Sequence, residues 1–248
     1  MASLQIGASG TIVVREDGTD TAYYISSNQT TRAGLSEAVP SFTVSDFDLT
    51  IVTGDKRFVL STHSSPPQFS LHVGGPEGGL NIQLFDTSHN DIPFQIATHT
   101  TVQHGVYDQA KNQVRGLVPN RLPKADLEAV IAVVDPLKRL NTILSDKTWV
   151  ADQIAKNVGT MPIFMRPGGA GYSKPCIDKF NYCKNMALVV YTLTVLGCGI
   201  GSLGASVATA GTASGLALAG GAVCASLAFT SFVKDNEKCH EDLGTCKD

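Results

Sequence analysis

Charged residues are scarce in this sequence, and their scarcity limits the functions open to it. Asp, Glu, Lys and Arg make up 17% of the 248 residues, the formal net charge is −3, and 43% of the residues are hydrophobic. Disordered chains combine low hydrophobicity with high net charge, so this composition argues against disorder. It also argues against a protein that binds nucleic acid by neutralising phosphates, and we expect no nucleic-acid partner.

Recognisable catalytic and metal-binding motifs are missing as well. The chain has no C-x-x-C pair and no G-x-S-x-G sequence, and its six histidines do not show zinc-site spacing. The glycine-rich stretch Gly197–Gly201 is not followed by the Lys and Ser or Thr of a phosphate-binding loop. We therefore expect no enzymatic activity, metal or cofactor. Met1–Glu16 lacks a basic start and a continuous apolar core, so no signal peptide is predicted there.

Residues 1–120 contain no cysteine and are predicted to form an antiparallel β domain. Short runs rich in Val, Ile, Thr, Phe and Tyr recur roughly every ten residues, with turn-forming residues between them. The clearest runs are Thr11–Arg15, Thr21–Ser26, Phe47–Thr53, Arg57–Thr62, Gln68–Val73, Leu80–Phe85 and Ile92–Thr98. Asp17-Gly18 and Gly54-Asp55 stand between runs, as hairpin turns would. Many short strands with regular turns favour a sandwich or barrel.

The hydrophobic period changes after Pro119 and Pro123, and residues 121–165 are predicted to form short helices that pack on the β domain. The expected helices are Ala125–Val134, Pro136–Leu144 and Asp146–Val158. Asp135 and Pro136 are typical of an N-cap and a first helical residue, and Gly159 of a helix end. Residues 166–175, which contain three Gly and two Pro, are predicted to be a linker.

All six cysteines lie in residues 176–248, and their positions are symmetric about one point in the chain. The intervals between successive cysteines are 7, 15, 26, 15 and 7 residues. Among the possible pairings of six cysteines, this spacing selects the nested one. The predicted disulfides are Cys176–Cys246, Cys183–Cys239 and Cys198–Cys224.

This symmetry predicts two antiparallel α-helices folded about Gly211. Residues at equal distances from the turn then lie opposite each other, and the intervals keep the three cysteines of each helix on one stripe. In a β-hairpin, odd intervals would place successive cysteines on opposite faces. The helices are expected from about Cys176 to Val207 and from about Leu216 to Leu243, so that the turn includes Gly211 and Gly215.

Small residues repeat the symmetry of the cysteines. A disulfide needs Cα atoms within about 7 Å, which is closer than ordinary helix packing, so small residues are required where the helices meet. The matching pairs are Gly197 with Ala225, Gly201 with Gly221, and Ala205 with Ala217. We expect these six residues at the helix–helix contact.

The 49 residues between Lys184 and Lys234 carry no charge. A helix pair on a soluble protein normally has a polar outer stripe, whereas the expected outer positions here include Leu188, Leu203 and Leu227. Each uncharged arm has roughly 22 residues, or about 33 Å of helix, which matches a bilayer core. Because the flanking charges stand only at the open end, both ends of a membrane-inserted hairpin would remain on one side.

In composition, this charge-free hairpin rich in Ala and Gly resembles the hydrophobic hairpin of pore-forming colicins. Those pore domains are all-helical, whereas residues 1–120 here are predicted to be β, so no residue roles are transferred from them.

Two functions remain open from the sequence. In the first, the β domain recognises an unidentified surface ligand and delivers the hairpin to a lipid membrane, as a pore-forming or bacteriocin-like toxin would. In the second, the chain is a non-enzymatic secreted structural or assembly protein, which buries the hairpin in the fold or in a self-association interface. Three disulfides predict an oxidising compartment, and hence a secreted or membrane-associated protein.

Overall fold

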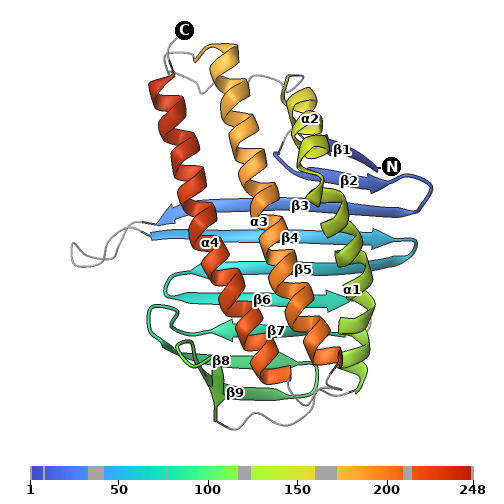
Figure 1. Ribbon diagram of the computed structural model, residues 1–248, viewed down its shortest axis with the longest axis vertical. Coiled ribbons are helices and arrows are strands. Elements are labelled where there is room, and N and C mark those ends of the chain that lie inside the picture. The colour runs from blue at the N-terminus through green and yellow to red at the C-terminus, as the bar shows by residue number, and fades with distance from the viewer. Residues whose placement is uncertain are drawn as a thin grey trace.

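The computed structural model describes residues 2–7, 9–32, 42–75, 78–116, 124–159, 172–208 and 214–246. Within these ranges, ten strands are followed by four helices (Figure 1). The strands are β1 (Ala2–Ile6), β2 (Ile12–Glu16), β3 (Thr21–Arg32), β4 (Phe42–Thr53), β5 (Lys56–Ser65), β6 (Gln68–Gly75), β7 (Gly78–Leu84), β8 (Asp91–Thr98), β9 (Val102–Asp108) and β10 (Gln113–Arg115). The helices are α1 (Lys124–Ser145), α2 (Lys147–Val158), α3 (Lys174–Ala208) and α4 (Ser214–Thr245).

The strands form one antiparallel sheet in which the spatial order is the chain order, from β1 to β10. Tight turns explain this simple topology: Gly18 and Gly54 adopt φ of 75° and 58° between consecutive strands, a conformation that glycine adopts without strain. The predicted antiparallel β domain is therefore confirmed. The seven runs identified from the sequence coincide largely with β2–β8, whereas β1, β9 and β10 were not predicted.

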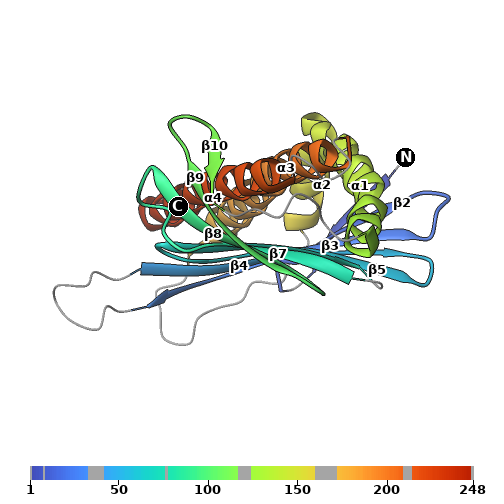
Figure 2. The same cartoon turned by 90° about the horizontal axis from the view of Figure 1, so that it is seen from below.

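The four helices lie on one side of the sheet (Figure 2). One row of side chains on this side crosses five neighbouring strands in register and is almost completely buried. Its members are Ile25, Leu49, Leu60, Val73 and Leu80. The layer that covers these side chains is helical, where a sandwich would have a second sheet. The reason is that apolar and polar side chains alternate along each strand, so that the sheet has one apolar face. The apolar helices of the same chain pack on that face.

Two helices connect the sheet to the hairpin, where three were predicted. α1 is continuous and contains Pro136, so Asp135 and Pro136 do not begin a new helix. The buried stripe of α1 runs through the proline, since Val133 and Leu137 lie before and after it and both are completely buried. The stabilisation gained when this stripe packs on the sheet exceeds the stabilisation lost with the backbone hydrogen bond that a proline removes from a helix.

The predicted boundaries of α2 are confirmed. The Asp146 carboxylate accepts a hydrogen bond from the backbone N–H of Trp149, and Gly159 follows the last helical residue. Of the predicted linker, residues 166–171 lie outside the described residues. Lys174 and Pro175 belong to the first turn of α3, where proline is tolerated because that turn needs no backbone donor.

A polar contact attaches α1 to the sheet. The Tyr23 hydroxyl donates a hydrogen bond to the Glu16 carboxylate, and Nε of Arg139 on α1 donates to the same carboxylate at 3.1 Å. Tyr23 is fully buried. Burial, together with the neighbouring carboxylate, raises the pKa of the Tyr23 hydroxyl above its ordinary value of 10.0.

This raised pKa predicts a loss of stability in alkali. The folded protein keeps Tyr23 protonated, so the stabilisation is complete below the ordinary tyrosine pKa of 10.0 and falls as the pH rises above it. We expect Tyr23→Phe to lose less unfolding free energy than the wild type between neutral pH and a pH above 10.0. Urea denaturation at both pH values measures this, and equal losses in the two proteins would contradict the assignment to Tyr23.

Candidate functional site: the disulfide-bonded hairpin

α3 and α4 lie side by side and antiparallel across the sheet (Figure 1). Disulfides join Cys176 to Cys246, Cys183 to Cys239 and Cys198 to Cys224, with Cα–Cα distances of 6.0, 5.8 and 5.7 Å. The predicted hairpin and its nested pairing are therefore confirmed. Three such bonds are compatible with an oxidising, extracellular or membrane-associated setting.

The predicted turn is only partly described. Gly211 lies outside the described residues. Gly215 was expected in the turn, but it belongs to the first turn of α4, which begins at Ser214. Gly215 is buried there.

The two helices approach each other closely at Gly221. A Cβ added to this glycine would lie 2.5 Å from both Cβ and Oγ of Ser202 and 3.2 Å from the carbonyl oxygen of Cys198. The absence of a side chain at Gly221 therefore lets α3 approach α4. Gly221 was predicted at the contact, whereas its neighbour Ser202 was not.

The prediction for the glycines of α3 is wrong. Gly197 and Gly201 are exposed, and a Cβ added to either would have no atom within 4 Å. The reason is rotation about the helix axis: Ser202 faces α4, and the preceding residue points about 100° away from it. On α4, Ala225 is fully buried and Ala217 half-buried. The side chain of Ala205 lies outside the described residues.

The hairpin packs its larger side chains against the sheet. The ring centroid of Tyr191 lies 5.2 Å from that of Phe47 on β4 and 4.7 Å from that of Phe232 on α4. The Tyr191 hydroxyl also shares a hydrogen bond of 2.9 Å with the Thr62 hydroxyl on β5. Leu188 and Leu203, expected on the outer side, are buried in this core. This core is shared by the sheet, α1 and both helices of the hairpin, and it covers the two leucines.

The opposite side of the hairpin faces solvent and carries no charge along its middle. Val190, Leu216 and Leu227 are 48%, 38% and 56% exposed, and are among the most exposed large apolar side chains of the described residues. Where burial is described between Lys184 and Lys234, the other exposed positions are Thr194, Gly197, Gly201, Cys224, Thr230 and Ser231. A surface helix normally places charged groups on this side. We call this surface the uncharged outer face.

By length and composition, both helices are able to cross a membrane. The candidate spans are Lys174–Leu203 and Gly215–Thr245, each with a mean hydropathy of 1.9 over its most apolar window. Within these windows, 61% and 50% of the residues are buried in the protein. Between half and two thirds of each apolar window is therefore covered by the rest of the protein, which includes the partner helix, α1 and the sheet.

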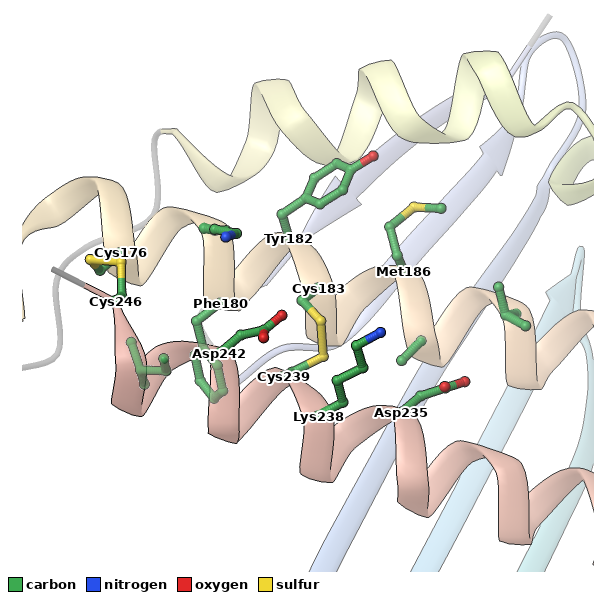
Figure 3. Close-up of a pocket in the computed structure, with 14 residues that line it drawn as sticks. Cys176, Phe180, Tyr182, Cys183, Met186, Asp235, Lys238, Cys239, Asp242 and Cys246 are labelled. Carbon is green, nitrogen blue, oxygen red and sulfur yellow. A yellow bond between two sulfur atoms is a disulfide. The ribbon is translucent and has the colours of Figure 1, made fainter.

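A groove of about 450 Å³ opens between α3 and α4 at the end of the hairpin where the charges begin (Figure 3). Its apolar lining includes Phe180, Met186, Ala187 and Val190, and two of the disulfides contribute to its walls. Its charged lining residues are Lys179, Asp235, Lys238 and Asp242. Figure 3 shows Lys238 and Asp242 pointing from α4 towards α3, and Phe180 pointing from α3 towards α4.

No groove was predicted here, although the symmetry of the hairpin contains the necessary signal. Cysteines that pair have residue numbers with one common sum, and Phe180 with Asp242 and Ala187 with Asp235 share that sum. The reasoning that paired the cysteines would therefore also have predicted that these residues lie opposite each other.

Among the described residues, no group of three or more His, Cys, Asp or Glu side chains could hold a metal ion. No family model, curated protein or solved structure matches this chain. A function is therefore inferred from the geometry of the hairpin itself.

Proposed function

We propose that this protein is a membrane-active toxin, of the pore-forming or bacteriocin-like kind, that inserts its disulfide-bonded hairpin into a lipid bilayer. The observation that carries the proposal is the uncharged outer face. Exposed positions such as Val190, Gly197 and Leu227 lack the charges that a permanently hydrated helix pair would have. The middle of the hairpin can therefore enter hydrocarbon without dehydrating a charged side chain.

The helical backbone supports the same proposal. In α3 and α4 the backbone hydrogen bonds are made within each helix, which is the condition for crossing a bilayer core. The three disulfides hold the two helices together as one unit. The pair would enter as a preformed hairpin, with its turn first and its charged end left at the surface.

In this proposal the sheet is a cover for the hairpin in water. Side chains such as Leu196, Leu218 and Phe229 are buried in the core that the sheet shares with the hairpin. Exposed together, they would form an apolar patch that promotes aggregation. In lipid, acyl chains would replace the sheet around these side chains. Insertion therefore exchanges one apolar environment for another and requires the hairpin to leave the sheet.

A second candidate function is that of a non-enzymatic structural or assembly protein. It is favoured by the burial of Leu188, Tyr191 and Leu203, which already have a partner within the chain. In that case the hairpin stays on the sheet, and the exposed Val190 and Leu227 contact another subunit. The protein would then self-associate and would not act on lipids.

Dye release from liposomes distinguishes the two functions. We expect the oxidised full-length protein to release an encapsulated dye, and a reductant to diminish the release because the helices are no longer held together. A monodisperse protein that causes no leakage at any lipid composition would refute the membrane function. Self-association in the same sample would support the structural alternative.

A further inference from the structure

We propose that the groove at the open end of the hairpin binds the head and upper acyl chain of one zwitterionic phospholipid. This inference rests on the membrane function proposed above and specifies the lipid class. The groove volume of about 450 Å³ is in the range of small-molecule sites in proteins. It is large enough for a phospholipid headgroup and the first part of a chain.

The charges of the groove have both signs, and this selects the lipid class. Lys179 and Lys238 would attract the lipid phosphate, and Asp235 and Asp242 would attract a quaternary ammonium group. No ion pair within 4.0 Å joins any of these four side chains to another residue of the described chain. Two unpaired cations and two unpaired anions around one groove match a zwitterion, whereas an anionic headgroup would meet two repelling carboxylates.

The groove extends from the charged end of the hairpin to the start of its uncharged segment. Phe180 lies among the charges, and Met186, Ala187 and Val190 continue the lining along α3 beyond Lys184, the last charged residue of that arm. Val190 is about 48% exposed, so this end of the groove is open to an incoming chain. Asp235 on α4 stands opposite Ala187 by the common sum of the cysteine pairs, so Val190 is the lining residue beyond the charges of both helices, and the acyl chain would lie there.

The position of the groove agrees with a bilayer interface. The uncharged segment ends at Lys184 on α3 and at Lys234 on α4, which would mark the boundary between hydrocarbon and headgroups after insertion. Lys179, Lys238 and Asp242 lie on the headgroup side of this boundary and Val190 on the hydrocarbon side. A bound phospholipid would therefore have the same depth and direction as its neighbours in the bilayer.

Calorimetric titration with short-chain phosphatidylcholine, below its micelle concentration, tests the inference on the oxidised full-length protein. We expect one lipid bound per protein and about tenfold weaker binding of phosphatidylglycerol with the same chains. Lys238→Glu should weaken phosphatidylcholine binding by about tenfold. Lys147→Glu, at an exposed position on α2 outside the groove, is the matched control and should bind as the wild type does.

Val190→Asp provides a second variant at the apolar end of the groove, and its exposed position favours an unchanged fold. It should also weaken binding, because an acyl chain would contact a carboxylate. No binding, equal binding of the two lipids, or wild-type binding by both groove variants would overturn the inference. Dye release without binding of monomeric lipid would reject the groove but keep the membrane function. Binding without dye release would keep the groove and reject the membrane function.

Discussion

Leu227→Asp should abolish dye release while leaving the folded protein intact. Leu227 is 56% exposed on the uncharged outer face, so an aspartate there remains hydrated as long as the hairpin lies on the sheet. After insertion the same carboxylate would lie in hydrocarbon. A central aspartate disfavours insertion of a helix by about 2.5–3.5 kcal/mol, so we expect dye release to fall by about a hundredfold or more.

Val102→Asp is the matched control for this variant. Val102 is 57% exposed on β9, and the substitution introduces the same charge at the same degree of exposure outside the hairpin. Its dye release should equal that of the wild type. Circular dichroism and urea denaturation should show that both variants fold. Wild-type leakage by Leu227→Asp, or equal loss of leakage in the two variants, would contradict insertion of the hairpin.

Gly221→Ala and Gly201→Ala should change stability in opposite directions. At Gly221 the new Cβ would overlap Ser202 at 2.5 Å, and the carbonyl oxygen of Cys198 prevents a simple shift. Overpacking of this kind lowers the free energy of unfolding by about 1–3 kcal/mol. At Gly201 no atom lies within 4 Å of the new Cβ, so the higher helix propensity of alanine should add up to about 1 kcal/mol.

Urea denaturation of the oxidised proteins measures both effects. A double variant tests the mechanism, because Ser202→Gly removes the Cβ that a new methyl at Gly221 would meet. The loss in Gly221→Ala with Ser202→Gly should be smaller than the sum of the two single losses. Additive losses, or equal effects of alanine at Gly201 and Gly221, would show that the helices do not approach each other at Gly221.

Local patterns in the sequence were sufficient for much of the fold. Short runs rich in Val, Ile, Thr, Phe and Tyr located β2–β8, and the predicted helix Asp146–Val158 coincides with α2 and its N-cap. Pro136 was misinterpreted for the complementary reason. A proline weakens a helix locally, but burial of Val133 and Leu137 on the same face depends on the sheet and outweighs that weakness.

The orientation of the hairpin was harder to predict than its existence. The positions of the cysteines predict which residues lie opposite each other, and all three predicted disulfides are confirmed. The cysteine positions do not determine how far each helix is rotated about its own axis. Gly201 was therefore assigned to a contact that Ser202 makes, and the groove lined by Lys238 and Asp242 was not predicted.

The amino-acid sequence by itself determined the antiparallel hairpin, its nested disulfides and its charge-free length, because each of these depends on distances counted along one chain. Only the tertiary structure decided which side of the hairpin is buried. A helix without charges has no polar stripe to mark its outer side, so Leu188 and Leu227 are equivalent in the sequence. Packing of the hairpin into the shared core makes them different, since it buries Leu188 and leaves Leu227 in water.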